Sequence, residues 1–325
     1  MVAMKNKILS ILLSSNDYVS GQSLANRLGV SRQAVWKGVN ALKEDGYEIN
    51  STPNKGYKLV SSPDFLNVEA IKNYLNTELI GREIIVLDSV SSTNDYLKEL
   101  GNNGCQEGVV VTTREQTKGK GRLGRTWQSE RDENIAFSIL LRPQVAPGGL
   151  VAVTPLAGLA MCKALRETTG LDCKIKWPND IVVGSKKLVG ILTEMTAEFD
   201  AVEYIVIGIG INIDQAVFPE EIEHKATSIL LETGRHYDKN RLLAKFLDRL
   251  EGELLRNDLR MSQTALNEYK DLCATIGKNV TFTRGSRKIN GMAVGVSENG
   301  ELKVMLSDGS ICGVFFGEVT VQGIY

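Results

Sequence analysis

The segment QTKGKGRLGRTW, residues 116–127, combines three glycines with four cationic side chains and no acid. Glycine lets backbone N–H groups approach a ligand closely, and neighbouring cations favour a phosphate or carboxylate ligand. Gly119, Gly121 and Gly124 also fit the G-x-G-x-x-G pattern of dinucleotide-binding loops. Such a loop follows a strand and opens a helix, but residues 126–134 are a polar stretch that leads into another strand. We therefore expect a long loop between antiparallel strands that closes over an anionic ligand.

Two other interpretations of this loop are a Walker phosphate-binding loop and a surface loop that binds no ligand. A Walker loop is excluded, because no Gly-Lys-Ser/Thr follows the glycines at the right spacing. A solvated surface loop without a ligand stays open on this segment alone. Because a loop rich in glycine and charge has little to bury, we expect it to be mobile when empty.

Strands and helices alternate on both sides of the loop, which predicts an α/β body. Strands are expected at 83–87, 109–114, 135–141, 174–177, 188–195 and 204–213, and helices from about 94 to 100 and at 150–169, 240–256 and 263–272. From Ile276 the chain changes to short strands with tight-turn signals at Asn299-Gly300 and Asp308-Gly309, which predicts a small all-β barrel. We expect three domains, with boundaries 1–63, 64–275 and 276–325.

The composition is typical of a soluble globular protein, with 42% hydrophobic residues and a net charge of −1 over 325 residues. No apolar run reaches the roughly 20 residues of a membrane span, and the short amphipathic run 8–13 does not resemble a signal peptide. The five scattered cysteines indicate reduced side chains in the cytoplasm. With His224 and His236 as the two histidines, a multi-histidine metal site is excluded and a histidine-based triad is disfavoured.

Residues 1–63 are basic, with eight cations against four acids, whereas the rest of the chain carries −5. Helical apolar spacing, small Ala25, Gly29 at a turn and Ser31 as an N-cap together predict a helix-turn-helix. Two short strands flanking residues 52–56 add a hairpin with a basic tip, which completes a winged helix.

The second of these helices is expected to read DNA. The candidate residues on its polar side and on the wing are Ser31, Arg32, Gln33, Trp36, Lys37, Asn40 and Lys55. Arg32 and Gln33 suit base edges in a major groove, and Lys37 and Lys55 suit phosphates. A helical hairpin with a solvated charged face, or a winged helix that binds protein, remain alternatives.

Three further segments place polar groups in unusual positions. Residues 176–180 (KWPND) end a strand in a turn, Lys187 begins an apolar strand, and residues 208–212 (GIGIN) put two glycines in a strand, where a ligand or another backbone must approach closely. Each also has an ordinary explanation: Lys187 as a surface lysine, Asn212 as a turn former, and Asp180 as a cap or an ion-pair partner.

Taken together, these segments resemble the biotin–protein ligase family, and the whole chain resembles its bifunctional bacterial form, which also represses the biotin operon. The matching pieces occur in family order at residues 92–94, 116–127, 176–180, 187–192 and 208–212. The resemblance implies a winged helix-turn-helix, a central mixed-sheet domain of the biotin/lipoate-ligase type, which is like that of class II synthetases, and a C-terminal SH3-like β barrel.

The resemblance also implies an activity. Biotin and MgATP would give biotinyl-5′-adenylate and pyrophosphate, and the adenylate would acylate a lysine of the biotin carboxyl carrier protein of acetyl-CoA carboxylase, with pyruvate carboxylase as a further acceptor. Operator DNA, a homodimer formed with the adenylate, a cytoplasmic location and no membrane partner are implied as well.

Residue roles follow from the matching positions. By resemblance, the biotin site is lined by Ser92, Thr93, Asn94 and Gln116. The biotin carboxylate and the α-phosphate are held by Lys120, Gly121 and Arg122, and Lys187 bridges the same two groups. The nucleotide is supported by Asn179 and Asn212, and Asp180 helps to place Mg²⁺ or the incoming lysine. Lys120, Arg122 and Lys187 are the expected catalytic residues. At Lys120 many relatives carry arginine, and lysine lacks the bidentate fork.

The chemistry of these residue types agrees with the implied activity. Attack of a carboxylate on a phosphate brings two anions together, and positioned cations neutralise that repulsion without a covalent enzyme intermediate. Two other classes stay open. A lipoate–protein ligase shares the fold, but its Arg-Arg and triple-glycine motif is absent here. A transcription factor that merely senses a metabolite would not require so many cations around one carboxylate.

Overall fold

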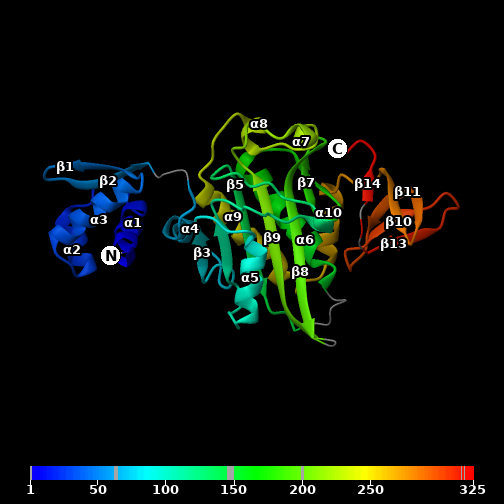
Figure 1. Cartoon of the computed structure of the whole chain (residues 1–325), viewed down its shortest axis with the longest axis horizontal. Coiled ribbons are helices and arrows are strands. Elements are labelled where there is room, and N and C mark those ends of the chain that lie inside the picture. Colours follow the sequence, from blue (N-terminus) through cyan, green and yellow to red (C-terminus); the bar gives the residue numbers. More distant parts are fainter. Residues whose placement is uncertain (1, 62–64, 145–149, 199–200, 316, 318) are drawn as a thin grey trace. The chain divides into compact units, whose positions relative to one another are not determined.

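The computed structural model describes residues 2–61, 65–144, 150–198, 201–315, 317 and 319–325. The chain divides into two compact units, one formed by Met1–Leu75 with Asp238–Ala244 and the other by Asn76–Tyr237 with Lys245–Tyr325. Each unit has its own core and is described by itself (Figure 1). None of the helices among the described residues combines the length and the apolar character that a membrane crossing needs.

The first unit is a winged helix-turn-helix. Its elements are α1 (Val2–Leu13), α2 (Gly21–Leu28), α3 (Arg32–Glu44), β1 (Glu48–Thr52), β2 (Gly56–Ser61) and α4 (Val68–Tyr74). Gly29 ends α2 with a φ of 65°, the left-handed conformation that glycine adopts at no steric cost. The Ser31 side chain accepts a hydrogen bond from the Ala34 N–H and so caps α3. The predicted turn, cap and wing are therefore confirmed.

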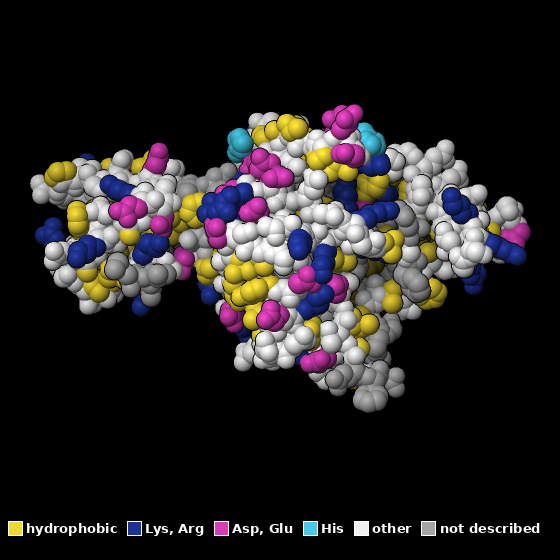
Figure 2. Space-filling view, in the orientation of Figure 1, with side chains coloured by type: hydrophobic (Ala, Val, Ile, Leu, Met, Phe, Trp, Pro, Cys, Tyr) yellow, Lys and Arg dark blue, Asp and Glu magenta, His cyan; other side chains and the backbone are white. Residues whose placement is uncertain are grey.

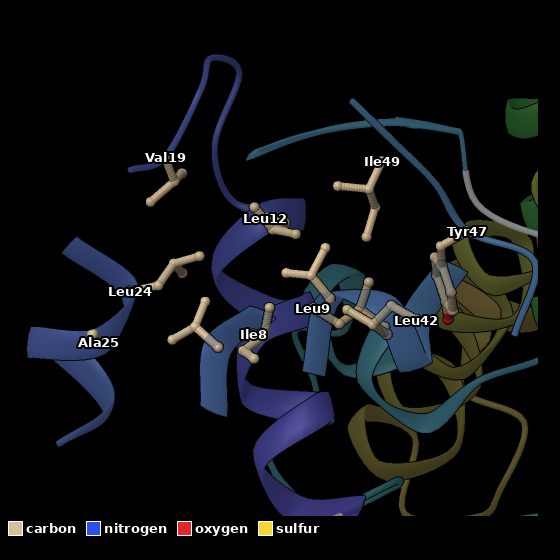
Figure 3. Packing of buried hydrophobic residues seen from close by; sticks show 11 residues of the cluster. Ile8, Leu9, Leu12, Val19, Leu24, Ala25, Leu42, Tyr47 and Ile49 are labelled. Carbon is tan, nitrogen blue, oxygen red and sulfur yellow. The ribbon is translucent and has the colours of Figure 1, made fainter. Parts of the chain in front are cut away.

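An apolar core holds the helices and the wing of this unit together. Figure 3 shows side chains from α1, α2, α3 and β1 converging, among them Leu9, Leu24, Leu42 and Ile49. Leu9, Leu24 and Leu42 are all at most 1% exposed. Burial of such side chains stabilises by about 1.5–3 kcal/mol each, so this core is sufficient to fix the orientation of α3.

The second unit is built on a seven-stranded mixed sheet with the order β3-β4-β5-β9-β8-β7-β6. The strands are β3 (Ile84–Leu87), β4 (Val110–Thr113), β5 (Asn134–Leu141), β6 (Cys173–Lys176), β7 (Asp180–Val183), β8 (Lys186–Glu198) and β9 (Ala201–Asn212). β3 and β4 are parallel, whereas every other neighbouring pair is antiparallel. The predicted mixed sheet is confirmed, and β4 and β5 flank the glycine-rich loop as antiparallel strands.

Helices cover both faces of this sheet. The helices of this unit are α5 (Thr93–Asn102), α6 (Val153–Thr169), α7 (Glu220–Glu223), α8 (Ile229–Thr233), α9 (Lys239–Arg256), which begins in the first unit, and α10 (Gln263–Leu272). Of these, α5 and α6 pack on the sheet. Figure 1 shows α5 in front of β5 and β9, with α6 behind β8. Because both faces are covered, β5 is buried along its whole length.

A second sheet closes the unit. It contains β10 (Asn279–Arg284), β11 (Arg287–Val296), β12 (Leu302–Met305), β13 (Ile311–Val314) and β14 (Val319–Val321) in the order β13-β12-β11-β10-β14. All neighbouring strands are antiparallel, which confirms the predicted all-β character of this part. The Trp177 indole N–H, at the end of β6, donates to the Gly300 carbonyl oxygen at 2.9 Å and ties the two sheets together.

Candidate functional site

The glycine-rich loop folds back on itself beside the central sheet. Gln116 forms an isolated antiparallel bridge with Ser129, and the Trp127 N–H donates to the Gly119 carbonyl oxygen at 2.9 Å. A Cβ atom at Gly119 would lie 2.4 Å from the Trp127 carbonyl oxygen, so this position requires glycine. Between Gly119 and Trp127 the chain forms a single 3₁₀ turn, Arg122–Gly124, and no α-helix begins there. The dinucleotide-loop interpretation is thereby excluded.

Two adjoining pockets lie under this loop. The larger has a volume of about 730 Å³ and the smaller about 50 Å³. Five residues line both of them: Gly121, Arg122, Trp127, Asn179 and Lys187. Cations and glycine backbone therefore stand at the junction of the two pockets, where two parts of one ligand, or two ligands, would meet. In the view of Figure 2, acidic and basic side chains are interspersed over the unit that holds this site.

A buried polar network forms the wall of the smaller pocket. The Gln116 Oε1 atom accepts hydrogen bonds from the Thr93 N–H at 2.9 Å and from its hydroxyl at 3.1 Å. The Ser138 hydroxyl oxygen lies 2.8 Å from the Thr93 hydroxyl oxygen and 2.6 Å from the Asn94 Oδ1 atom. The Asn94 Nδ2 atom donates to Glu194 Oε2 at 2.7 Å. These partners fix each side chain, so the pocket presents a set of hydrogen-bonding groups that is already organised.

The N-terminus of α5 places the first of these residues. Ser92 precedes the helix, and its hydroxyl accepts from the Asp95 N–H at 3.5 Å. Thr93 and Asn94 therefore begin the helix facing the sheet, where both are buried. A Cβ atom at Gly208 on β9 would lie 2.0 Å from the Asn94 Oδ1 atom, so the close approach of α5 to the sheet requires glycine there.

Two more sheet glycines make room for Trp127. A Cβ atom at Gly210 would lie 2.4 Å from the indole ring, and one at Gly190 would lie 2.9 Å from it. The Trp127 ring thus lies against β8 and β9 at the boundary of the pockets. Its buried Nε1 atom has no hydrogen-bond partner among the described residues. A buried donor without a partner costs about 1–3 kcal/mol, so a ligand that accepts this hydrogen bond would be favoured.

The cations at the junction are already held by neighbouring groups. The Arg122 guanidinium donates to Asn179 Oδ1 at 2.9 Å and to the Gly317 carbonyl oxygen at 3.1 Å. The Lys187 Nζ atom lies 2.6 Å from Asp180 Oδ1 and 5.5 Å from the centre of the Trp127 ring. Both side chains are therefore oriented before any ligand arrives.

Lys120 sits differently from these two cations. Its Nζ atom lies 2.6 Å from the Asp95 Oδ2 atom, and 47% of its side chain is exposed. Burial opposes ionisation of Asp95, but hydrogen bonds from the Lys120 and Lys98 ammonium groups outweigh it and lower the pKa of that carboxyl. The Asp95 carboxylate is thus the present counterion of Lys120, and an anionic ligand would have to compete with it.

The larger pocket combines polar and apolar walls. The Asn212 Nδ2 atom donates to the Thr227 carbonyl oxygen at 2.9 Å and fixes the segment that follows β9. The apolar side chains of Phe218, Ile222 and Ala226 also line this pocket. A pocket lined by apolar side chains and an indole ring suits a flat aromatic group such as a nucleobase.

The winged-helix unit presents its predicted residues on α3 and on the wing. Arg32, Gln33, Trp36 and Lys37 are exposed, and Trp36 remains 55% exposed although it is large and apolar. Asn40 is half-buried, and Lys55 lies on the hairpin between β1 and β2, with its Nζ atom 5.9 Å from the Tyr18 ring. An exposed polar helix face beside a basic wing has the form of a DNA-reading surface.

Three family models match the chain. The biotin/lipoate A/B protein ligase family matches residues 86–212, an HTH domain matches residues 5–58, and the biotin protein ligase C-terminal domain matches residues 275–321. The bifunctional ligase/repressor BirA of Bacillus subtilis is 35% identical over 91% of this chain and 92% of its own length. The Escherichia coli protein of the same name is 30% identical over 97% and 96%.

The chain belongs to the bifunctional ligase/repressor BirA family. A solved structure of the biotin protein ligase from Aquifex aeolicus in complex with biotin and ATP has 32% identity and a TM-score of 0.65, covering 74% of this chain and 99% of its own. The predicted family and fold class are thus confirmed. The domain boundaries 1–63, 64–275 and 276–325 stay a prediction.

The residues predicted for the site gather at the two pockets of this family member. The smaller pocket is lined by Ser92, Thr93, Asn94, Gln116 and Lys120, and the larger by Asp180 and Asn212. The other four predicted residues line both pockets: Gly121, Arg122, Asn179 and Lys187. Sequence reasoning missed Ser138 and Glu194, which complete the polar network, and Tyr325, which lines the larger pocket. A serine within the apolar run 134–141 was the available signal for Ser138.

Proposed function

We propose that this chain is a biotin–protein ligase that also represses transcription. It joins biotin to ATP as biotinyl-5′-adenylate, releases pyrophosphate, and transfers biotin to a lysine of a biotin carboxyl carrier protein. The observation that carries this proposal is that two cationic residues, Arg122 and Lys187, each line both pockets and so lie where the pockets meet. We assign the smaller pocket to biotin and the larger to ATP. An Aquifex aeolicus relative solved with both molecules supports the presence of these two ligands.

The biotin subsite is assigned from hydrogen-bonding capacity. The ureido group of biotin offers both donors and acceptors, and the network of Thr93, Asn94, Gln116 and Ser138 offers the complementary groups. Ser92 contributes by capping the helix that carries Thr93 and Asn94. Because these side chains are fixed by one another, little conformational entropy is lost when the ligand binds.

Adenylate formation requires two anions to approach. A biotin carboxylate oxygen attacks the α-phosphorus atom, a new P–O bond forms, and the bond to pyrophosphate breaks. Gly121, Arg122 and Lys187 lie where charge develops, and loss of one preorganised donor of this kind costs about 3–4 kcal/mol. Lys120 lies beside them but would first have to leave Asp95. Asn179 orients Arg122, and Asn212 supports the nucleotide side of the site.

Transfer of biotin uses the same junction. The amine of the acceptor lysine attacks the carbonyl carbon of the mixed anhydride, and AMP leaves with the bonding electron pair, while the amine proton passes to solvent. A Mycobacterium tuberculosis relative, 32% identical over 70% of this chain, is a biotin–[acetyl-CoA-carboxylase] ligase. We therefore propose the carrier domain of acetyl-CoA carboxylase as an acceptor, and that of pyruvate carboxylase as a second one.

A magnesium ion is proposed only as part of the nucleotide substrate. Among the described residues, no group of three His, Cys, Asp or Glu side chains could hold a metal, and Asp180 is the single carboxylate that lines the larger pocket. Magnesium commonly uses one or two carboxylates together with substrate phosphates and water. The triphosphate and water would thus supply its ligands, with Asp180 helping to place it from the wall of the larger pocket, and its charge would help to neutralise the leaving pyrophosphate.

Repression is proposed to follow from adenylate binding. The adenylate would order the loop 116–127 and promote a homodimer whose two winged helices bind a palindromic operator through Arg32, Gln33 and Lys37. Linkage then requires the adenylate to raise dimer affinity and operator affinity together. Sedimentation and gel-shift titrations with and without the adenylate test this coupling, and a dimer that forms equally well without it would contradict the coupling.

One assay tests the enzymatic part of the proposal. Purified protein, labelled biotin, MgATP and a carrier domain should give a labelled carrier, and lipoate in place of biotin should not. Pyrophosphate exchange that depends on lipoate alone would overturn the substrate assignment, and failure of the intact protein to transfer biotin would instead support a metabolite-sensing transcription factor.

A further inference from the structure

Tyr325, the last residue of the printed sequence, reaches into the larger pocket from the segment after β14. Its backbone N–H donates to the Ser185 carbonyl oxygen at 3.1 Å, and the preceding Ile324 is buried. Ser185 lies in the turn between β7 and β8, the hairpin that carries Asp180 and Lys187. Residues 324 and 325 are therefore held against the β7–β8 hairpin, and the proposed mechanism uses the side chains of Asp180 and Lys187 from this hairpin.

The Tyr325 side chain makes two contacts there. Its hydroxyl donates a hydrogen bond to the Asp180 Oδ2 atom, and the Lys176 Nζ atom lies 3.3 Å from the centre of its ring. Ring and hydroxyl thus each have a separate partner.

The two oxygens of Asp180 consequently face different groups, Oδ1 in an ion pair and Oδ2 in a hydrogen bond. Oδ1 faces the Lys187 ammonium at 2.6 Å, and Oδ2 accepts from Tyr325. The terminal torsion of an aspartate side chain is broad and only weakly restrained by itself. A donor fixed on one oxygen restrains that rotation and so holds the other oxygen toward Lys187. A lysine ammonium on a flexible stem gains most from such a fixed partner.

We propose that Tyr325 is a positioning residue for adenylate formation, because its hydroxyl orients Asp180 and Asp180 in turn orients Lys187. This inference rests on the proposed ligase function. Tyr325 does not touch the smaller pocket, so its contribution falls on the rate of adenylation and not on biotin binding.

The test separates the hydroxyl from the ring. Tyr325→Phe keeps the ring on Lys176 and removes only the donor to Asp180. Hydrogen bonds to charged groups are worth enough that we expect an approximately tenfold slower single-turnover rate of biotinyl-adenylate formation at saturating substrates. The dissociation constant of biotin, measured by calorimetry, should stay unchanged. Tyr204→Phe is the matched control, because that hydroxyl donates to Asn102 at 2.6 Å outside both pockets.

A double-mutant cycle shows whether the effect passes through Asp180. Asp180→Asn with Tyr325→Phe should be no slower than Asp180→Asn alone, since the group that Tyr325 orients has then lost its charge. Effects that multiply, or a Tyr325→Phe protein with the wild-type rate, would overturn the inference while leaving the ligase assignment intact. A wild-type protein that forms no adenylate would overturn the proposed function and this inference with it.

Discussion

The Nζ atom of Lys187 lies 2.6 Å from the Oδ1 atom of Asp180, on the neighbouring strand of the central sheet. The strand register shifts between Ile181 and Val182, directly opposite this stretch of β8. Such a bulge re-aims side chains relative to a regular ladder. The shift lies beside Lys187, whose side chain lines both pockets.

Replacement of Lys187 by alanine should remove adenylate formation almost entirely. Loss of one preorganised donor costs about 3 kcal/mol in the transition state, which is a drop of about 100-fold in rate. The measurement is biotin-dependent pyrophosphate exchange, with circular dichroism to verify folding. Lys186→Ala is the matched control, because the exposed side chain of Lys186 lines neither pocket. Equal rates for both variants would refute the role given to Lys187.

Gly208→Ala should weaken biotin binding and destabilise the fold. The added methyl group would overlap the Asn94 amide at 2.0 Å, so α5 or Asn94 must shift, at a typical cost of about 1–3 kcal/mol. Thermal unfolding and biotin calorimetry measure the two effects. Gly252→Ala, in the interior of α9 with nothing within 4 Å of its new Cβ, should instead stabilise by about 0.5–1 kcal/mol. A biotin affinity unaffected by Gly208→Ala would argue against the assigned subsite.

Loss of a phosphate contact in Lys37→Ala or Lys55→Ala should weaken DNA binding by about the same factor whatever the base sequence of the DNA. Each removed phosphate contact is expected to lower the slope of log K against log salt by about one. Arg32→Ala should instead relax base preference at one position. Gel shifts at several salt concentrations distinguish these behaviours, with Lys303→Ala on the exposed face of β12 as control. Salt slopes that match the control would contradict a DNA-contacting role.

The buried cysteines should resist alkylation in the folded protein. Burial raises the pKa of the Cys162 thiol to about 12 and also raises those of Cys173 and Cys273. Because the thiolate is the reactive form, a raised pKa keeps these residues inert at pH 8. Mass spectrometry after iodoacetamide treatment should find label on Cys105 and Cys312 at most, and on all five after unfolding. Rapid labelling of Cys162 in native protein would show that the core is open.

Strongly patterned elements could be predicted from the sequence, and short ones could not. The helix predicted at 263–272 is observed as Gln263–Leu272, with Ser262 as its cap. In contrast, α4, α7 and α8 were missed, since helices of four to seven residues show too few turns for a periodic signal. β7 was also missed, because it has four residues and directly follows a turn.

Within the site, the side chains that carry charge could be predicted, but their partners could not. Ser138 faces Gly208 across the β5–β9 pair, and that register brings its hydroxyl to Asn94. Tyr325 contacts Asp180 across 145 residues of chain. Contacts of this kind depend on sheet register and on the docking of the second sheet, which no local pattern encodes.

The spacing along β9 has a further consequence. Gly208, Gly210 and Asn212 alternate along one strand, and they meet Asn94, Trp127 and the larger pocket in turn. Consecutive members of this series are about 7 Å apart, because a strand rises about 3.3 Å per residue. Under the proposed ligand assignment, the backbone of β9 would therefore set the distance between the ring of biotin and the α-phosphate. Homologues of biotin with a longer acyl chain should bind yet react slowly, because their carboxylate would extend past the α-phosphorus atom. Since the strand backbone sets this distance, a side-chain substitution should not restore the rate.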